Sequence, residues 1–359
     1  MPIHPAAGDP SYVRWANGTI GAVRTIDPAT GWFQVESAGK TGWITGRYLT
    51  VVSLDPDPEP QEDEILTYAV GAWNLEHFHD GATRGFPENT FGGPSYNSRT
   101  DADFERIARI ITTQLFAKIL ILSEINGRSG TKKSDELDRL LRFLGNNWAY
   151  ELTAAGRSQR VAILYDSSTA RKEKCVEIDV PPQQDNGKDV FERDPLACLF
   201  VLLDAAGQDK NDLIVVGLHL ASGQQLVNNH NTAMEVLRTR LHQALADGTF
   251  PAGERDILIG GDLNASRYDN QVENFWEGYD NARFRFVTLA PADGTQYPGT
   301  RLAGVPLFPR SQIDYLMASG QTGGLVDELV QAVAHVHIEL LASDFNDFRQ
   351  HVSDHIPVT

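Results

Sequence analysis

A short acidic, proline-rich segment divides this chain and constrains its fold more than any other feature. Residues 55–64 read Asp-Pro-Asp-Pro-Glu-Pro-Gln-Glu-Asp-Glu, with three prolines and six carboxylates. The prolines stiffen the segment and the carboxylates keep it solvated, so it cannot contribute to a hydrophobic core. We therefore expect a linker over residues 54–64, between a small domain at residues 10–53 and a larger one at residues 65–359.

The small domain carries short β-type runs broken by glycine and asparagine. Residues 32–36 alternate between apolar and polar side chains, residues 38–40 favour a turn, and residues 41–45 return. This hairpin, with Tyr48-Leu49 after it, resembles a bacterial SH3-like domain. The resemblance implies a small β-barrel that binds a ligand, often a cell-wall peptide. A barrel that only packs on its neighbour is the alternative.

The large domain mixes strands and helices without strict alternation. Strands are predicted at residues 66–73, 118–123, 161–165, 196–203, 213–218, 257–260 and 312–317, and helices at residues 101–117, 135–144 and 228–246. Several strands follow one another in the manner of hairpins. The pattern predicts an α+β sandwich in which two sheets pack face to face and helices cover the outside.

Polar side chains lie where the predicted buried strands of the large domain end. These residues are Asn74, Glu76, Glu124, His219, Asp262, Asn264, Asp354 and His355, and Asp314 lies inside an apolar strand. Packing of a core does not call for such side chains. Carboxylate and amide oxygens are the ligands that Mg²⁺ prefers, and a carboxylate in an apolar strand needs a partner such as an imidazole. The pattern therefore predicts a divalent metal beside a scissile phosphate.

The order and spacing of these motifs resemble the endonuclease/exonuclease/phosphatase superfamily, over residues 66–359. The resemblance implies a four-layered α/β/β/α sandwich and hydrolysis of phosphate esters. It also implies roles for single residues. Metal ligands would be Glu124 with Asn74, Glu76 and Asp354; catalytic residues would be His219, Asp262, Asn264, Asp314 and His355. Asp314 would orient His355, and the choice of general base between histidine and aspartate stays open.

One position departs from the pattern of the pancreatic-type DNases in this superfamily. Those enzymes support the imidazole that His219 resembles with a glutamate, whereas this chain has Gln159. Gln159 carries no charge, so a DNase-type acid role for His219 is in doubt. The next residue, Arg160, is a candidate for binding the substrate phosphate. His77, close to the metal motif, is predicted to be an exposed loop histidine.

Composition limits the other inferences. The net charge of −17 argues against a basic nucleic-acid groove, though not against a nuclease that holds one phosphate with metal and a local arginine. No apolar run is long enough to span a membrane. Cys175 and Cys198 lie in apolar β-type runs and are predicted to be buried thiols rather than a disulfide.

The sequence therefore predicts a metal-dependent phosphodiesterase, and first a nuclease acting on DNA or RNA. The loop after Asn74 and the helix before Glu124 resemble those of bacterial secreted or periplasmic nucleases, and the SH3-like module agrees with that location. A phosphatase or phospholipase C-type enzyme on inositol phosphates or sphingolipid head groups is the alternative, and a non-catalytic binding protein is a third. The ligand types do not distinguish Mg²⁺ from Mn²⁺ or Ca²⁺.

Overall fold

The structure is a computed structural model in which the chain divides into two compact units, Met1–Ile65 and Leu66–Thr359. It describes residues 2–3, 13–14, 22–27, 32–37, 40–45, 68–78, 99–127, 131–154, 159–178, 190–191, 193–221, 227–264, 286–288, 290–291, 313–320, 324–325, 329, 333–335, 337, 340, 348, 352–353 and 355–359. The predicted linker lies outside these residues, and each unit is described by itself.

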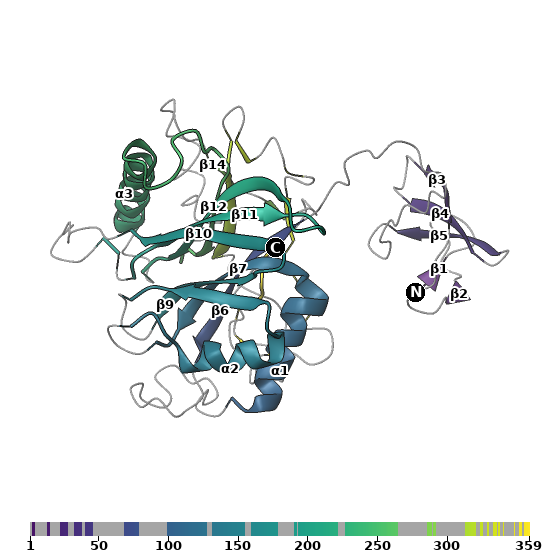
Figure 1. The fold of residues 1–359 in the computed structure, drawn as a ribbon. Helices are drawn as coiled ribbons and strands as arrows, with labels where there is room; N and C mark the ends of the chain where they lie inside the picture. Colours follow the sequence, from purple (N-terminus) through teal and green to yellow (C-terminus); the bar gives the residue numbers. More distant parts are fainter. Residues whose placement is uncertain are drawn as a thin grey trace. The chain divides into compact units, whose positions relative to one another are not determined.

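The first unit contains two small groups of strands (Figure 1). Strands β1 (Pro2–Ile3) and β2 (Val13–Arg14) pair with each other. Strands β3 (Ala22–Asp27), β4 (Trp32–Ser37) and β5 (Lys40–Thr45) form an antiparallel sheet in that order. The β4–β5 pairing runs to Ser37 and Lys40, so the predicted hairpin is present. The SH3-like barrel stays a prediction.

The first sheet of the second unit has four strands. In spatial order they are β6 (Ala69–Phe78), β7 (Ala117–Ile125), β9 (Arg160–Asp166) and β8 (Trp148–Leu152). Strands β6 and β7 are parallel, whereas the other neighbours are antiparallel. Strand β9 is buried along its whole length, which explains why it reads as a continuous apolar run rather than an alternating one.

The second sheet has six strands. In spatial order they are β10 (Ala170–Glu177), β11 (Leu196–Leu203), β12 (Asp209–His219), β13 (Ile257–Asp262), β16 (Asp314–Ser319) and β14 (Phe286–Thr288). Strands β12 and β13 are parallel and the other neighbours are antiparallel. A separate parallel pair joins β15 (Ala290–Pro291) and β17 (Val333–Ala334).

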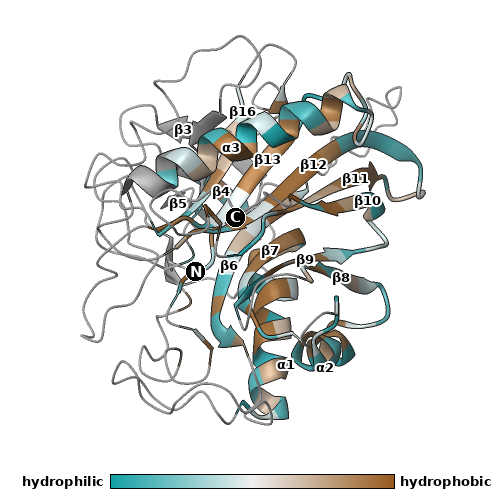
Figure 2. Ribbon diagram, turned by 90° about the vertical axis from the view of Figure 1, so that its left-hand side faces the viewer, coloured by the Kyte–Doolittle hydropathy of each residue, from teal (hydrophilic) through white to brown (hydrophobic). Residues whose placement is uncertain are grey.

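Helices cover the outer faces of the two sheets. They are α1 (Asp101–Ile110), continued by the π-helical turn η2 (Ile111–Leu115), α2 (Asp135–Leu144) and α3 (Val227–Ala246). Figure 2 shows α3 on one side of the stacked sheets and α1 with α2 on the other, with apolar strands between them. The α/β/β/α layers of the prediction are therefore present. Among the described residues, no helix combines the length and the apolar character that crossing a membrane requires.

The helix starts follow the sequence signals. At α1 the Thr100 backbone N–H donates to Asp103 over 2.6 Å, and at α2 the Ser134 hydroxyl accepts from the Leu137 N–H over 3.3 Å. Both are capping arrangements that satisfy backbone groups at a helix start. The predicted helix at residues 101–117 is α-helical only to Ile110, because the following turn is π-helical and Phe116 has a φ of 52°.

Strand alternation sorts the core into two clusters. In β12, Leu213 and Val215 belong to the cluster between the sheets, while Ile214 and Val216 belong to the cluster under α3. The inner cluster continues to α1 and α2 through the four-stranded sheet. A two-residue period thus supplies both faces of the six-stranded sheet with apolar side chains.

Glycine sets how closely the two sheets approach. A Cβ atom built on Gly217 of β12 would lie 2.6 Å from a side-chain carbon of Val161 and 3.1 Å from one of Ile121. Both neighbours belong to the four-stranded sheet, in β9 and β7. A larger residue at Gly217 would therefore separate the layers that carry the candidate site.

The C-terminal residues extend the first sheet. Ala72 of β6 and Val358 exchange backbone hydrogen bonds of 2.7 and 2.9 Å. On the other side, Thr359 and His335 exchange bonds of 3.0 and 2.8 Å. These bonds place His355, three residues before Val358, next to the end of β6, where Trp73 Nε1 donates to the His355 carbonyl oxygen over 3.0 Å.

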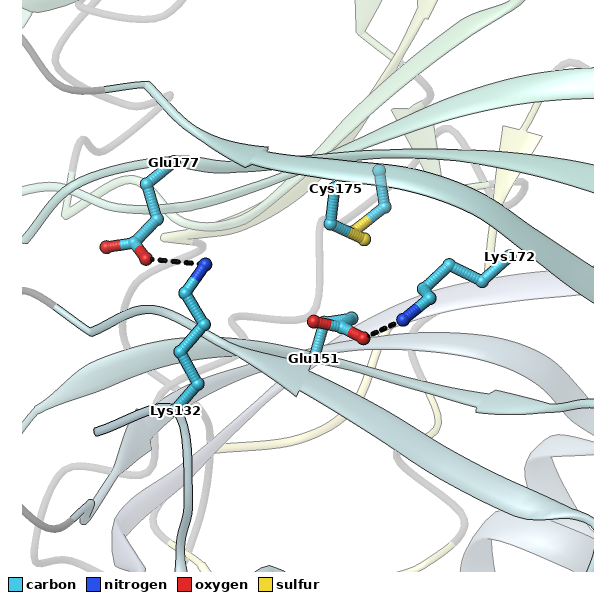
Figure 3. The surroundings of a disulfide bond; sticks show 6 residues. Lys132, Glu151, Lys172, Cys175 and Glu177 are labelled. Atoms are coloured by element: carbon cyan, nitrogen blue, oxygen red, sulfur yellow. Dashed lines mark hydrogen bonds and ion pairs between the residues drawn. A yellow bond between two sulfur atoms is a disulfide. The ribbon is translucent and has the colours of Figure 1, made fainter.

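The expectation of two free thiols is wrong, because Cys175 and Cys198 form a disulfide (Figure 3). The register of β10 and β11 places them directly opposite each other, with 4.1 Å between their Cα atoms. On either side of the bond, ion pairs join β10 to the neighbouring layer: Lys172 pairs with Glu151, and Glu177 with Lys132. The prediction of free thiols was wrong because strand register, which decides which residues lie opposite each other, cannot be read from two isolated apolar runs.

Candidate active site

Four strand ends from the two sheets meet at one edge of the sandwich. Asn74 lies near the end of β6 and Glu124 near the end of β7, while His219 and Asp262 are the last residues of β12 and β13. His219 pairs with Asp262 in the parallel register of β12 and β13. Because β6/β7 and β12/β13 are parallel pairs, each sheet brings two carboxyl ends to the same edge.

Asn74 joins the two sheets at this edge. Its Nδ2 donates to Glu124 Oε1 over 3.1 Å and to Asp262 Oδ2 over 3.0 Å. Its Oδ1 accepts from the Glu76 backbone N–H over 2.8 Å, which fixes the orientation of the amide. Asn74 therefore holds the two carboxylates together and turns its NH₂ group, not its oxygen, toward them, which departs from the predicted oxygen ligand.

Glu124, His219 and Asp262 form a group that fits a divalent cation. One ligand atom from each lies within 4.8 Å of the others; His219 Nε2 is 3.9 Å from Glu124 Oε1 and 3.8 Å from Asp262 Oδ2. Two carboxylates held this close repel each other unless a cation or a proton lies between them. Carboxylate oxygens suit Mg²⁺ and Mn²⁺, and the imidazole adds a ligand that Mn²⁺ accepts more readily than Mg²⁺.

A second acidic group adjoins the first. Asp314 Oδ2 lies 2.7 Å from His355 Nδ1, and both side chains are buried. His355 Nε2 lies 3.9 Å from Asp262 Oδ2, and Asp262 pairs with Asp314 in the antiparallel register of β13 and β16. Burial, and then the charge of Asp314, raise the pKa of Asp262 to about 7. Without a cation, Asp262 therefore holds a proton at weakly acidic pH.

His219 is a buried, neutral imidazole. Burial, and then the nearby charge of Arg193, lower its pKa to about 3. Its Nδ1 atom is buried without a hydrogen-bond partner in the described part of the chain. In the described residues no group accepts a hydrogen bond from Nδ1, so nothing stabilises the protonated ring through that atom. At neutral pH the ring carries one proton. If that proton is on Nδ1, Nε2 can accept a proton or bind a cation. Only the other tautomer, with the proton on Nε2, could donate from that atom.

Asn264 closes the edge beside Asp262. Its backbone N–H donates to Asp262 Oδ1 over 2.8 Å, and its Nδ2 donates to the Leu220 carbonyl over 2.8 Å. The residue has a φ of 47°, a conformation that asparagine tolerates better than most residues. Asn264 thus fixes both the Asp262 carboxylate and the loop that follows His219.

Two further predicted metal ligands are Glu76 and Asp354. Glu76 is half-buried and has a φ of 42°, so the strand alternation that would align it with Asn74 no longer holds there. Its role as a ligand stays a prediction. Asp354 lies outside the described residues, although its neighbours Ser353 and His355 are both buried at the site.

Arg160 is buried at the start of β9. Its side chain is 2 % exposed, and Nη1 donates to the carbonyl oxygens of Thr131 and Thr153 over 2.6 and 3.1 Å. It thereby ties two segments beside β9 together. Its role as a phosphate contact stays a prediction.

Two residues at the site, His77 and Arg193, were not among the predicted site residues. His77 is half-buried rather than exposed: its backbone N–H donates to Glu124 Oε2 over 2.9 Å, and its imidazole Nδ1 lies 3.5 Å from the same oxygen. Gln159 Nε2 lies 3.5 Å from His77 Nδ1, and Gln159 Oε1 accepts from Arg193. Arg193 precedes strand β11 in an acidic stretch that also contains Lys188, so the sequence does not single it out.

No protein-family model matches this chain, and a search among curated proteins finds no significant match. Solved structures do resemble it. A conserved protein of unknown function from Enterococcus faecalis V583 is 15 % identical, with a TM-score of 0.52 over 80 % of this chain and 96 % of that one. An endonuclease/exonuclease/phosphatase from Bacteroides vulgatus is 12 % identical, with a TM-score of 0.51 over 80 % and 95 %.

A mannosyl-6-phosphatase from Bacteroides thetaiotaomicron VPI-5482 is 13 % identical, with a TM-score of 0.50 over 81 % of this chain and 98 % of that one. At such identities the likeness concerns the fold. The shared fold spans nearly the whole length of these proteins and agrees with the order of motifs in the sequence. About four-fifths of this chain therefore shares the fold of these proteins, one of which is described as an endonuclease/exonuclease/phosphatase.

Proposed function

We propose that residues 66–359 form a metal-dependent phosphoesterase, and that nucleic acid, DNA or RNA, is its first candidate substrate. The observation that carries this proposal is the pairing of two groups at one sheet edge. Glu124, Asp262 and His219 form a cation-binding group, and Asp314 with His355 forms an imidazole–carboxylate pair 3.9 Å from Asp262. Together they would hold a cation and supply the proton acceptor that hydrolysis of a phosphate ester needs.

In this proposal Glu124 and Asp262 would hold the cation, Mg²⁺ or Mn²⁺, with Ca²⁺ as a further candidate. When bound, the cation polarises the phosphoryl group and offsets the charge that builds on its oxygens. Asn74 keeps the two carboxylates in place through its NH₂ group. Asn264 holds the other oxygen of Asp262, so that this carboxylate has one fixed orientation toward an attacking water.

Two groups are placed to take the proton of that water. Asp262 is the first, because Asn74 and Asn264 fix its carboxylate at the same edge as the cation-binding group. His355 receives a fixed orientation from Asp314, whose carboxylate accepts a hydrogen bond from Nδ1, and its Nε2 lies 3.9 Å from Asp262 Oδ2. An Asp262→Asn variant and a His355→Ala variant distinguish them, because only the general base shifts the acidic limb of the rate profile when it is replaced.

Arg193 is a further candidate for binding the substrate phosphate, beside Arg160. It is half-buried, it donates to Gln159 and, over 3.4 Å, to the Leu220 carbonyl, and its charge acts on His219. A guanidinium in this position can bind a phosphate oxygen at the same edge as the cation-binding group. We include Arg193 in the proposed substrate-binding residues.

A phosphatase acting on a small phosphate ester is the second candidate. The net charge of −17 disfavours a polyanion. One of the similar structures is a mannosyl-6-phosphatase. Inositol phosphates and sphingolipid head groups are the other small phosphate esters in this class. A non-catalytic binding protein is the third reading.

The proposal for the first unit is a ligand-binding SH3-like domain, with a cell-wall peptide as its candidate ligand. A location in the periplasm or outside the cell agrees with that ligand. The Cys175–Cys198 disulfide supports this location, because disulfides form and persist in oxidising compartments.

The test is hydrolysis of plasmid DNA, single-stranded RNA and an inositol hexakisphosphate solution, each with Mg²⁺, with Mn²⁺ and with EDTA. His355→Ala serves as the blank, and His335→Ala, at an exposed histidine, is the matched control. Metal-dependent nicking that disappears only in His355→Ala establishes the nuclease. Phosphate release without cleavage of nucleic acid establishes the phosphatase. Activity that survives His355→Ala is contamination, and no activity on any substrate sinks the catalytic proposal for these substrate classes.

A further inference from the structure

Arg99 is a buried arginine on which two segments of the candidate site converge. Its side chain is 4 % exposed, and Nη2 donates to the carbonyl oxygens of Leu75 and Val352 over 2.7 and 2.8 Å. Weaker bonds of 3.2 Å reach the carbonyls of Glu76 and His77. One guanidinium thus binds three successive carbonyls after Asn74 and a fourth carbonyl just before Ser353.

The three successive carbonyls belong to an unusual turn. Glu76 and His77 have φ values of 42° and 43°, in a region that residues other than glycine rarely adopt. Such a conformation persists only where its surroundings impose it. Arg99 supplies that constraint, because its planar fork of N–H groups matches several carbonyl oxygens at once and its charge strengthens each bond.

The turn reaches the cation-binding group directly. The conformation that points the carbonyls at Arg99 also directs the His77 N–H to Glu124 Oε2, over 2.9 Å. The same Glu124 carboxylate uses its other oxygen, Oε1, toward Asn74 and His219. If the turn relaxes, Glu124 loses the donor that fixes Oε2, and Oε1 is no longer held in one position.

The fourth carbonyl connects Arg99 to the other half of the site. Val352 precedes Ser353, whose hydroxyl donates to the Asn74 carbonyl over 2.7 Å and accepts from the His355 N–H over 2.9 Å. Arg99 itself is anchored where α1 begins, since Thr100 is bonded to Asp103. A rigid helix start therefore holds both the Glu124 side and the His355 side of the site.

We propose that Arg99 is a positioning residue that fixes Glu124 and His355 relative to each other, and so sets cation affinity and turnover. This inference rests on the proposed function, and it concerns no contact between Arg99 and substrate. Replacement of a residue that orients metal ligands typically weakens metal binding by about 10- to 100-fold. We expect Arg99→Met to raise the Mn²⁺ dissociation constant by at least about 10-fold, with kcat reduced and KM changed less than kcat.

The experiment measures free Mn²⁺ by electron paramagnetic resonance during titration of full-length wild type, Arg99→Met and Arg99→Lys, and then kcat and KM at saturating Mn²⁺. Lysine keeps the charge but has no planar fork, so the Mn²⁺ affinity and kcat of Arg99→Lys should lie between those of wild type and Arg99→Met. Two controls run alongside. Arg171→Met removes an exposed arginine that pairs with Asp209 and Glu173.

Ser319→Ala is the control for general loss of stability. Ser319 is buried at the end of β16 away from Asp314, and its hydroxyl bonds to Arg255, Ile257 and Leu325. The Ser319→Ala substitution should lower the melting temperature while leaving Mn²⁺ affinity at the wild-type value. A loss of Mn²⁺ affinity in Arg99→Met and not in Ser319→Ala supports positioning.

Three outcomes overturn the role of Arg99. The first is that both Arg99 variants keep Mn²⁺ affinity and kcat within twofold of wild type, and the second is that Ser319→Ala loses as much Mn²⁺ affinity as Arg99→Met. The third is that neither Arg99 variant folds, which assigns Arg99 to folding alone. A wild-type protein that binds no Mn²⁺ instead contradicts the proposed phosphoesterase. Failure of the Arg99 role is therefore distinguishable from failure of the proposed phosphoesterase, because it leaves Mn²⁺ binding and hydrolysis by the wild-type protein intact.

Discussion

At the scale of single residues, the site is built from charged and polar groups whose states depend on burial. His219 and Asp262 lie 3.8 Å apart and are shifted in opposite directions, with the pKa of His219 lowered to about 3 and that of Asp262 raised to about 7. Both shifts favour the uncharged form, which is what a buried site without a cation requires. The two residues therefore make opposite contributions to the pH dependence of stability.

For His219 the unfolded chain, with an ordinary pKa of 6.5, binds more protons than the folded chain between pH 6.5 and about 3. Its contribution to stability is complete above pH 6.5 and falls as the pH decreases. In EDTA, we expect the free energy of unfolding of wild type to fall relative to His219→Gln by about 2 kcal/mol from pH 7 to pH 5. Urea unfolding of both proteins at both pH values measures this change. If the difference in free energy of unfolding between wild type and His219→Gln is the same at pH 7 and pH 5, His219 is not a neutral, buried residue.

Asn74→Asp tests how closely Glu124 and Asp262 are held. The variant replaces the NH₂ group that bridges them with a third carboxylate, so in EDTA the free energy of unfolding should fall by roughly 2 kcal/mol or more. Mg²⁺ or Mn²⁺ should recover more stability in this variant than in wild type. Asn74→Ala, which removes the bridge without adding charge, is the control. Equal recovery by metal in both variants would mean that the cation does not bind between these carboxylates.

At the scale of strands and helices, apolar runs ended by polar residues predicted the strands and the edge at which the site forms. Six strand-end residues, Asn74, Glu124, His219, Asp262, Asn264 and His355, do come together, because parallel pairing and a sandwich leave their strand ends little choice of position. The roles assigned to them stay predictions.

The contributions of Arg99, His77 and Arg193 could not be predicted, because each depends on contacts between distant segments. Arg99 and Val352 are far apart in sequence, and His77 reaches Glu124 only through a turn with positive φ. The Cys175–Cys198 bond depends on the register of β10 and β11. Periodicity describes one strand at a time, so it contains none of this information.

The close approach of the two sheets can be tested at Gly217. A methyl group there would lie 2.6 Å from Val161, so Gly217→Ala should lower the free energy of unfolding by about 1–3 kcal/mol through overpacking. Gly253→Ala is the matched control, because nothing lies within 4 Å of a Cβ at that position. Guanidinium unfolding measures both. Equal stability in the two variants would show that the sheets separate at little cost.

The disulfide stabilises the edge of the second sheet by restricting the unfolded chain. Its two cysteines are 23 residues apart, so loop closure predicts a contribution of roughly 3 kcal/mol. Dithiothreitol should lower the free energy of unfolding of wild type by about that amount and should leave Cys175→Ala/Cys198→Ala unchanged. Thiol titration checks that the bond is reduced. If the wild-type protein is then equally stable with and without reductant, the β10–β11 pairing is already restrained in the unfolded chain.

At the scale of the whole molecule, the chain has two compact units, Met1–Ile65 and Leu66–Thr359. Every residue of the two hydrophobic clusters lies between Ala72 and Val358, so the second unit contains the core that supports its own site. The backbone pairing of Val358 with Ala72 also closes this unit with its own C-terminal residues. The acidic segment at residues 55–64 lies between the predicted domains and carries six of the carboxylates that give the chain its net charge of −17.

We therefore expect a protein of residues 66–359 alone to fold and to keep the catalytic constants of the full chain on a small substrate. Bis(4-nitrophenyl) phosphate with Mn²⁺ is suitable, since it is too small to depend on a separate binding domain. Because both clusters remain intact, kcat, KM and the urea midpoint should stay within about twofold, whereas any binding to cell-wall peptide should be lost. A large loss of turnover on this small ester, with the fold preserved, would show that residues 1–65 contribute to the active site itself and that the two units act as one enzyme.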